Sequence, residues 1–529
     1  MSHGADTRRV DVTTAALPLL RRTAEGTPDF VLTPRPRARR ASTPPTQALR
    51  MPDRAPGPGE QYRFHVDMGA CIGCKCCVVA CNEQNGNPAA INWRRVAEIE
   101  GGWYPDAHQH YLSMGCNHCL EPTCLAGCPV DAYTKDPATG LVQHSADACI
   151  GCQYCTWNCS YGVPQYNAER GVVGKCDMCH GRLSLGQSPA CVAACPEGAI
   201  RVEVVQVEAW RRAVTAAPAG DGLPREDGSL STTRVTMPQG LPPDARARPA
   251  RIEPQDPHWP LVIMTVLTQL SVGTLVTVFL LQLLGGRAAL GAAAIVSFGV
   301  AALALGASTL HLGRPVHALR ALRMWRRSWL SREVLLFGLF SGAAAVYAGA
   351  LWIGLPWAYL PGAATTVLGV AGVAASGCIY RVTSRGTWNT PLTPAAFLLT
   401  AGVLGPLLAG AVGAGDALWL AAASAVMASA QLVVLALRYV RLAIARHEEL
   451  RGAARLLATV LAPWLAARGA LLVAGGIVMP LLLPTPVGLA AALLTATTGE
   501  LVGRYLFFVS ALPTHVTSAY LPLGSEVAA

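Results

Sequence analysis

The chain has 529 residues, of which 52% are hydrophobic and only 14% are charged, and its formal net charge is +10. So low a charged fraction argues against a wholly soluble protein. Because the arginines flank long apolar runs, the positive charge indicates membrane topology, and we expect no nucleic-acid partner.

Residues 1–60 are rich in Arg and Pro, as at Arg8, Arg9, Arg21 and Arg22. The short apolar stretch at 17–20 is too brief for the core of a signal peptide. We expect a disordered N-terminal extension, because such a composition does not support a packed core. The alternative is an arm that ties the chain to a partner subunit.

The next stretch, from Cys71 to Cys195, contains 17 of the 18 cysteines. Sixteen of them form four groups, and the first and third groups share the spacing C-x2-C-x2-C-x3-C. The groups are Cys71, Cys74, Cys77 and Cys81; Cys116, Cys119, Cys124 and Cys128; Cys149, Cys152, Cys155 and Cys159; and Cys176, Cys179, Cys191 and Cys195. Cys76 is left over, and we expect it to be a small buried residue.

This spacing is typical of ligands to iron–sulfur clusters. Three cysteines at C-x2-C-x2-C surround one cluster, and the fourth, three residues later, ligates the other cluster of a pair. The four groups therefore predict four [4Fe–4S] clusters in two pairs. Zinc is one alternative, but structural zinc sites use isolated C-x2-C pairs. Disulfides are another, and they suit small secreted domains.

The segments CNHCLEPTCLAGCPVDAY, CIGCQYCTWNCSYGVPQYN, KCDMCHGRL and CVAACPEGAI resemble the four-cluster ferredoxin subunit of dimethyl sulfoxide reductase-type molybdoenzymes. The resemblance covers about 62–205 and implies an α+β double ferredoxin-like domain. It implies that the second group holds a [4Fe–4S] rather than a [3Fe–4S] cluster, because position 124 is a cysteine. It also implies four ligand sets: Cys71, Cys74, Cys77 and Cys195; Cys176, Cys179, Cys191 and Cys81; Cys116, Cys119, Cys124 and Cys159; and Cys149, Cys152, Cys155 and Cys128.

Aromatic residues accompany the cysteines within the expected ferredoxin domain, residues 61–210. We expect Trp93, Trp103, Tyr154 and Trp157 to pack around the clusters and limit the entry of water. Residues 211–258 are rich in Pro, Gly and Ser. They predict a semi-extended tether that builds no core.

Residues 259–515 predict an all-α polytopic membrane domain. Eight apolar runs are each near the length that crosses a bilayer: 261–284, 288–310, 334–354, 358–380, 391–412, 415–438, 468–486 and 487–512. One of the last two could be tilted or re-entrant, since their connection is short. We expect an amphipathic surface helix at 439–465 and a C-terminal tail at 516–529.

The motifs HLGRPVHALRAL (311–322), SWLSRE (328–333), RGTWNTPLT (385–393) and GELVGRYLFF (499–508) resemble the eight-helix membrane anchor of the same enzyme family. The resemblance covers about 255–515 and implies electron exchange with quinol. In that family the two parts are usually separate subunits, whereas here they are fused.

Polar side chains inside apolar spans are costly and therefore functional candidates. With the first span starting on the ferredoxin side, His311 and the run Ser331, Arg332 and Glu333 lie at that side, and Glu500 and Arg504 lie in the last span. We expect His311, Glu500 and Arg504 to form a quinone site, with His311 as partner of a quinol oxygen. Alternatively, His311 caps a helix and Glu500 pairs with Arg504, four residues later on the same face.

The sequence thus predicts a non-catalytic electron-transfer and membrane-anchor subunit. It would pass electrons from menaquinol or ubiquinol, through four [4Fe–4S] clusters, to a separate molybdopterin catalytic subunit. One alternative is the reverse direction, in a sulfite, formate or similar dehydrogenase that reduces quinone. A second alternative, of another class, is a ferredoxin on a passive membrane anchor.

The connections after spans two, four and six carry 14 arginines, whereas the opposite side carries Arg287. Because short Arg-rich loops stay in the cytoplasm, we expect a bacterial inner-membrane protein with its ferredoxin domain and both termini cytoplasmic.

Overall fold

The computed structural model describes residues 50–103, 105–216, 223–224, 228–242, 245–247, 252–286, 288–513 and 520. Most of the expected N-terminal extension, most of the C-terminal tail and Arg287 lie outside these residues. Residues 47–529 form one unit, within which the cysteine-rich part and the helical part are in contact.

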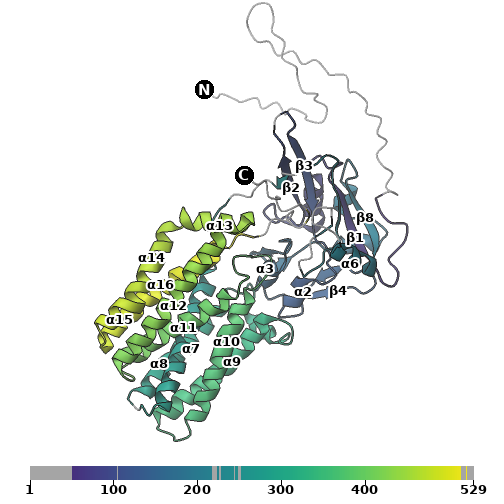
Figure 1. The fold of residues 1–529 in the computed structure, drawn as a ribbon. Coiled ribbons are helices and arrows are strands. Elements are labelled where there is room, and N and C mark those ends of the chain that lie inside the picture. Colours follow the sequence, from purple (N-terminus) through teal and green to yellow (C-terminus); the bar gives the residue numbers. More distant parts are fainter. Residues whose placement is uncertain are drawn as a thin grey trace, which may run out of the picture. The chain divides into compact units, whose positions relative to one another are not determined.

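The cysteine-rich part is built from two small sheets, two hairpins and short helices (Figure 1). In one sheet β1 pairs antiparallel with β8 and parallel with β9, and in the other β2 lies between β3 and β10. The strands are β1 Glu60–Asp67, β2 Arg95–Gly101, β3 His108–Met114, β4 Tyr133–Lys135, β5 Val142–His144, β6 Gln165–Asn167, β7 Val172–Gly174, β8 Ile200–Gln206, β9 Arg234–Thr236 and β10 Arg246–Ala247. The helices are α1 Cys76–Asn85, α2 Thr123–Gly127, α3 Tyr154–Asn158, α4 His180–Leu183, α5 Ala190–Ala193 and α6 Val207–Ala216.

The expectation of a tether at 211–258 is wrong for much of the described part of that segment. It supplies β9 and β10, and Thr232 is fully buried. The Thr232 hydroxyl donates to the Asn117 carbonyl at 2.7 Å, and the Trp210 indole donates to the Ser231 carbonyl at 2.8 Å. Buried hydroxyls with partners of this kind let a Pro-rich, weakly apolar segment pack against the strands.

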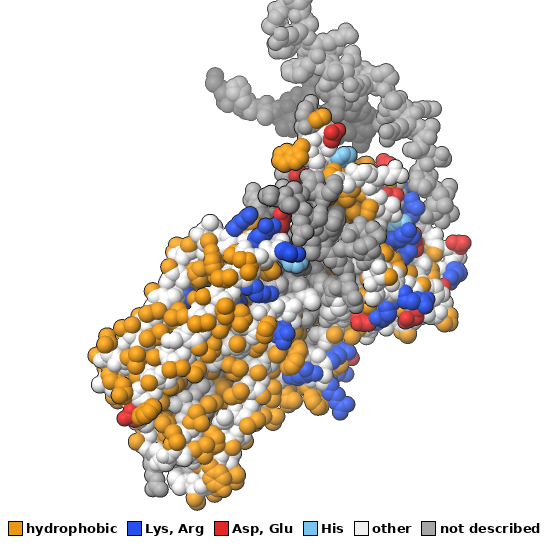
Figure 2. All heavy atoms as spheres, viewed as in Figure 1, with side chains coloured by type: hydrophobic (Ala, Val, Ile, Leu, Met, Phe, Trp, Pro, Cys, Tyr) orange, Lys and Arg blue, Asp and Glu red, His pale blue; other side chains and the backbone are white. Residues whose placement is uncertain are grey.

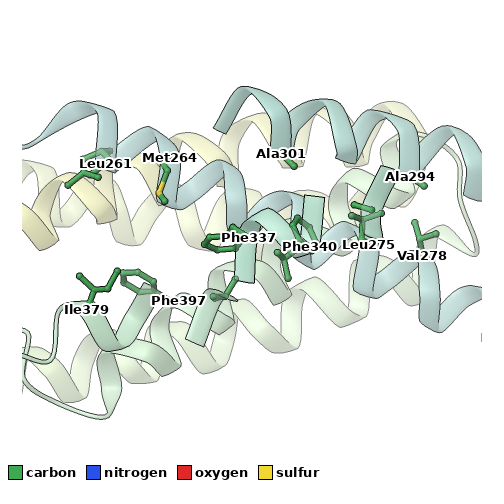
Figure 3. Packing of buried hydrophobic residues seen from close by; sticks show 14 of the residues in the cluster. Leu261, Met264, Leu275, Val278, Ala294, Ala301, Phe337, Phe340, Ile379 and Phe397 are labelled. Atoms are coloured by element: carbon green, nitrogen blue, oxygen red, sulfur yellow. The ribbon is translucent and has the colours of Figure 1, made fainter. Parts of the chain in front are cut away.

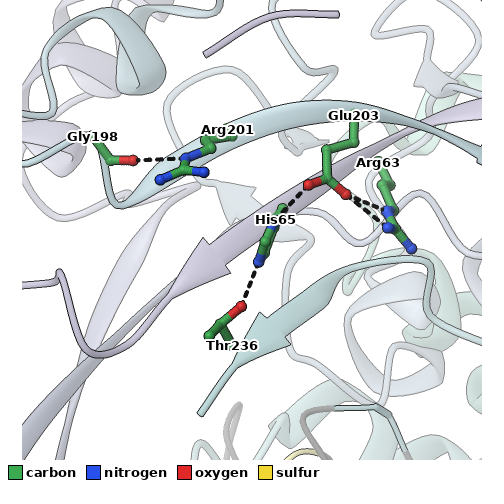
Figure 4. Close-up of polar contacts among 6 residues, drawn as sticks. All are labelled: Arg63, His65, Gly198, Arg201, Glu203 and Thr236. Atoms are coloured by element: carbon green, nitrogen blue, oxygen red, sulfur yellow. Dashed lines mark hydrogen bonds and ion pairs between the residues drawn. The ribbon is translucent and has the colours of Figure 1, made fainter. Parts of the chain in front are cut away.

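Figure 4 shows how side chains fasten β9 to β1 and β8. One His65 nitrogen, Nδ1, lies 2.5 Å from Glu203 Oε1, and the other, Nε2, lies 2.7 Å from Thr236 Oγ1. Arg63 donates to the same carboxylate from Nε and Nη2, at 2.9 and 2.7 Å. Burial alone would raise the pKa of Glu203, but the hydrogen bonds from His65 and Arg63 outweigh it and hold that pKa at about 2.

Glu203→Gln is expected to lower the free energy of unfolding by about 1–3 kcal/mol at pH 7, since charge-assisted hydrogen bonds are lost. A carboxyl with a lowered pKa stabilises the fold fully above its unfolded pKa and loses that contribution as the pH falls toward its folded pKa. The stability gap between parent and variant should therefore narrow below about pH 4.5. Thermal unfolding at several pH values measures the gap, with the exposed Glu169→Gln as control. A gap of constant size down to pH 3 would contradict the assignment.

The described residues of the helical part form eight helices long and apolar enough to cross a membrane, which confirms the expected multi-pass architecture. They are α7 Trp259–Leu283, α8 Leu290–Thr309, α9 Trp329–Trp352, α10 Tyr359–Ile379, α11 Leu392–Ala411, α12 Ala417–Ala443, the run Ala462–Leu482 and α16 Pro486–Val509. A 3-10 helix, η2 Pro315–Leu322, precedes α9, and α13 Glu448–Ala458 precedes the seventh crossing. Figure 2 shows hydrophobic side chains over the visible surface of this part, with Lys and Arg gathered where it meets the cysteine-rich part.

Helix α7 is the most buried of the eight and packs on α8, α10, α11 and α16. Figure 3 shows apolar side chains from α7 to α11 meeting in one core, including Leu275, Phe337 and Phe397. Glycines allow α7 and α11 to cross closely. A Cβ added to Gly405 would lie 2.2 Å from the Gly273 backbone, so no larger residue fits there.

Two details of the helical part differ from expectation. The seventh crossing is continuous but contains a π-helical turn, Ala474–Val478, between α14 Ala462–Val473 and α15 Met479–Leu482. The expected surface helix at 439–465 is shorter, because α12 runs on to Ala443 and α14 begins at Ala462. Only α13 lies between them, and Arg441 belongs to α12.

Candidate functional site

The structure brings the sixteen cysteines together in four sets, each with three cysteines of one group and the fourth cysteine of another. Cys71, Cys74, Cys77 and Cys195 line one cavity, and Cys116, Cys119, Cys124 and Cys159 line another. In the other two sets the thiols lie near enough to interact electrostatically: Cys81 with Cys176, Cys179 and Cys191, and Cys128 with Cys149, Cys152 and Cys155.

The backbone around these sets is shaped to wrap a bound group. It turns left-handed at Lys75 and at Gln153, which hold the same position in the first and third groups. Backbone N–H groups also donate to sulfur, from Ala132 to Cys128 at 3.3 Å and from Gly151 to Cys149 at 3.4 Å. Such donors stabilise thiolate ligands. Among the described residues, no three His, Cys, Asp or Glu side chains converge on a position for a single metal ion.

Two buried cations beside the cysteines were not anticipated from the sequence. Arg94 is fully buried and interacts with Cys77, Cys81, Cys176 and Cys191, and two of its nitrogens have no hydrogen-bond partner. Lys175 lies 3.7 Å from the Cys116 sulfur. Isolated Arg and Lys residues carry no recognisable sequence signal, although Lys175 is adjacent to Cys176. Both cations would offset the negative charge of four thiolates around iron.

Three expectations about residues near the cysteines differ from the structure. Cys76 is exposed rather than buried, because it begins α1 on the solvent side of that helix. Trp103 is 85% exposed, so it shields no cluster. Tyr154 and Trp157 are buried, but against the membrane helices.

The loop that carries Cys149 and Cys152 rests on the segment after α8. The backbone N–H of Gly313 donates to the Gly151 carbonyl at 3.4 Å, and that of Arg314 donates to the Ile150 carbonyl at 3.1 Å. Only glycines permit this approach, since a Cβ on Gly151 would lie 2.8 Å from Gly313 Cα. The set formed by Cys128, Cys149, Cys152 and Cys155 is thereby held at the ends of the membrane helices.

An aromatic layer continues this contact into the helices. It consists of Trp157, His258, Tyr380, Trp388, Phe397, Phe507 and Phe508. The Trp157 ring centroid lies 5.4 Å from that of Trp388, which lies 5.1 Å from that of Phe507. Trp157 follows Cys155 by two residues, so the layer begins at the cysteine set.

His311 lies in the same segment as Gly313, next to the cysteine loop. Its Nδ1 donates to the Ser308 carbonyl, which leaves Nε2 as the acceptor of the neutral ring. Burial lowers the pKa of His311 to about 4; the hydrogen bond to Ser308 opposes this lowering, and His258 adds to it. Glu333 of α9 is only 5% exposed and interacts electrostatically with Tyr154. The sequence placed Glu333 near this end of the helices but assigned it no role.

Glu500 and Arg504 lie elsewhere, in a cavity of about 100 Å³ between α11, α12, α14 and α16, called the basic cavity here. Its polar lining comprises Arg438, Arg468, Arg504, Glu500, Gln431, Thr400, Thr387, Tyr439 and Ser510. The Glu500 carboxylate accepts from Arg468 at 2.8 Å, from Thr400 at 2.8 Å and from Gln431 at 3.1 Å. Arg504 donates to Gln269 at 2.9 Å and lies 3.6 Å above the Phe397 ring.

The expected quinone site of His311, Glu500 and Arg504 is therefore divided, because His311 does not line the basic cavity. The alternative expectation was an ion pair between Glu500 and Arg504. Glu500 instead forms its ion pair with Arg468 on α14.

Comparison with known families supports both halves. Residues 107–205 match the model of a 4Fe-4S dicluster domain, and residues 255–509 match that of the DMSO reductase anchor subunit (DmsC).

Similar proteins are found for part of the chain. It is 41% identical over 146 residues to a component of the anaerobic dimethyl sulfoxide reductase of Haemophilus influenzae, covering 26% of this chain and 71% of that protein. It is 37% identical over 198 residues to YnfG of Escherichia coli K12, a probable anaerobic dimethyl sulfoxide reductase component, covering 36% and 92%. It is 34% identical over 160 residues to a component of the sulfite dehydrogenase of Allochromatium vinosum, covering 26% and 67%.

Proposed function

The chain belongs to the dimethyl sulfoxide reductase family, as an iron–sulfur subunit fused to the membrane anchor, and we propose that it carries electrons from a membrane quinol to a separate molybdopterin catalytic subunit. The observation that supports this most is the contact between the Cys149–Cys152 loop and the segment Gly313–Arg314. Electron transfer between membrane and head requires one redox centre at the ends of the helices.

The four cysteine sets would each hold one [4Fe–4S] cluster. All ligands are thiols, N–H groups point at sulfur, and Arg94 and Lys175 supply positive charge, which together suit an anionic iron–sulfur cluster. Bound clusters supply single-electron transfer. The protein's own contribution is to hold the thiols, to exclude water with buried residues and to set the local charge.

The quinol head group would lie at His311. The Nε2 atom of the neutral imidazole accepts a hydrogen bond from a quinol hydroxyl and then its proton. The carboxylate of Glu333 is the second candidate acceptor, since it is buried near Tyr154 of the cysteine loop. Either menaquinol or ubiquinol fits this chemistry.

One observation supports the reverse direction, from a dehydrogenase to quinone, as the alternative. A formate dehydrogenase iron–sulfur subunit of Haemophilus influenzae is 37% identical over 168 residues. Cluster potentials decide between the directions, and cysteine ligation leaves them anywhere from roughly −700 to +450 mV.

The test uses membranes that contain the full chain and its co-purifying subunits. We expect a reduced quinol analogue to reduce the clusters, as followed by electron paramagnetic resonance, and a molybdenum protein to co-purify. Clusters that no quinol analogue reduces and no quinone analogue oxidises would instead indicate a ferredoxin on a passive anchor.

The orientation is proposed from charge. Arginines cluster in the connections at the ferredoxin side, so this side would face the cytoplasm of a bacterium, at the inner membrane. A fluorescent protein fused after Ala529 is then expected to be bright, and alkaline phosphatase fused there to be inactive. Strong phosphatase activity from that fusion would place the catalytic partner outside the cytoplasm.

A further inference from the structure

The basic cavity contains more positive than negative charge. Three guanidinium groups, on Arg438, Arg468 and Arg504, face one carboxylate, on Glu500. Arg468, Arg504 and Glu500 are each at least 94% buried. Uncompensated charge in a membrane domain is strongly destabilising, so the surplus calls for an anion.

Buried donors of the cavity remain without partners. Arg468 Nη1 and Arg504 Nε have no hydrogen-bond partner among the described residues. Arg438, which is half-buried, lies over the Phe507 ring at 5.3 Å. Buried N–H groups are nearly always satisfied in folded proteins, which indicates that a bound group accepts from them.

The position of the cavity identifies the kind of anion. Arg438, Arg468 and Arg504 lie within seven residues of one end of α12, α14 and α16, and Thr387, from the loop before α11, lines the same cavity. The ends of helices that span a bilayer lie at the level of the lipid head groups. The rest of the lining is apolar, with Val434, Leu435, Leu457 and Leu465. On α12 it adjoins exposed apolar residues, Val433 and Leu437.

We propose that the basic cavity binds the phosphate of an anionic phospholipid, with its acyl chains along the apolar side of α12. Arg438 and the free N–H groups of Arg468 and Arg504 would donate to the phosphate oxygens, because guanidinium groups match phosphate geometry. A neutral quinone head group would leave the positive surplus uncompensated. Basic pockets between membrane helices are suited to anionic head groups.

Arg438→Gln tests the proposal, since it removes one charge and leaves the Glu500–Arg468 pair in place. The full chain with its co-purifying subunits is delipidated in detergent and titrated with phosphatidylglycerol, phosphatidylcholine, inorganic phosphate or a quinone analogue. Phosphatidylglycerol should raise the thermal unfolding temperature of the parent, and Arg438→Gln should weaken its binding about fivefold to tenfold. Arg455→Gln, at an exposed arginine of α13 outside the cavity, should bind as the parent does.

Two companion variants test whether misfolding, and not the lost charge, explains weaker binding by Arg438→Gln. Arg438→Lys retains the charge and should recover part of the binding. Val434→Trp fills the apolar side of the cavity and should weaken the binding of phosphatidylglycerol. The electron paramagnetic resonance spectrum of the clusters should stay unchanged. If inorganic phosphate stabilised the protein as much as phosphatidylglycerol does, the ligand would be free phosphate and the lipid proposal would be wrong. A quinone analogue that Arg438→Gln no longer binds, or unchanged lipid binding in Arg438→Gln, would overturn the proposal.

Discussion

Replacement of His311 by alanine is expected to slow quinol oxidation about 100-fold or more, because the variant lacks the positioned proton acceptor. The clusters should assemble as in the parent, since the His311 side chain bonds to the Ser308 carbonyl and His311 is not one of the sixteen cysteine ligands. The measurement combines quinol-dependent reduction with the electron paramagnetic resonance spectrum of the dithionite-reduced protein. The expected result is a normal spectrum and a lost quinol rate.

His317→Ala provides the matched control, because this histidine lies on η2, six residues further along the same segment. Its quinol rate should remain near that of the parent. His311→Gln keeps a hydrogen-bond acceptor of similar size but cannot carry the proton, so it should bind quinol and oxidise it slowly. A parent rate in His311→Ala would rule His311 out, whatever happens at Glu333.

The spans were predictable because a membrane helix must be a run of about 20 apolar residues. The third span is informative, since we expected 334–354 and the helix is Trp329–Trp352. Its first turn contains Ser331, Arg332 and Glu333, which polarity alone assigns to water. Both Ser331 and Glu333 are in fact buried: the Ser331 hydroxyl donates to the Pro129 carbonyl, and Glu333 lies near Tyr154, both in the cysteine-rich part. Such burial depends on packing that no local pattern encodes.

Pairings between distant residues were predictable only where a motif carries them. The cysteine sets cross from one group to another, as the resemblance implies, because the spacing is a local signal with a fixed geometric meaning. The Glu500–Arg468 pair has no such signal, since the residues lie 32 positions apart on two helices. From the sequence, Arg468 is only one of the arginines in the connection after the sixth span. Likewise, the packing of the Pro-rich segment 228–242 depends on strands and buried acceptors that lie elsewhere in the chain.

Loss of the cluster nearest the membrane should be the most damaging single change in the ferredoxin part. Cys128→Ser and Cys149→Ser are expected to abolish the same resonance signal and to stop quinol-dependent reduction of the remaining clusters. Their positions explain why, since Cys128 belongs to the second group but lies with Cys149, and this set rests on Gly313 and Arg314. Iron should fall from about 16 to about 12 per chain.

The crossed arrangement makes a prediction that a simple grouping along the chain does not. Cys124→Ser and Cys159→Ser should both lose one and the same second signal, because Cys124 and Cys159 line one cavity. This signal is distinct from the one lost in Cys128→Ser. Cys76 and Cys378, the latter the one cysteine outside residues 71–195, belong to no set. Cys76→Ser and Cys378→Ser should therefore leave both signals and the iron content unchanged. If Cys128→Ser instead removed the Cys124 signal, the fourth cysteine of each group would ligate its own cluster. Electrons from the quinol would then enter the ferredoxin part through a different set of thiols.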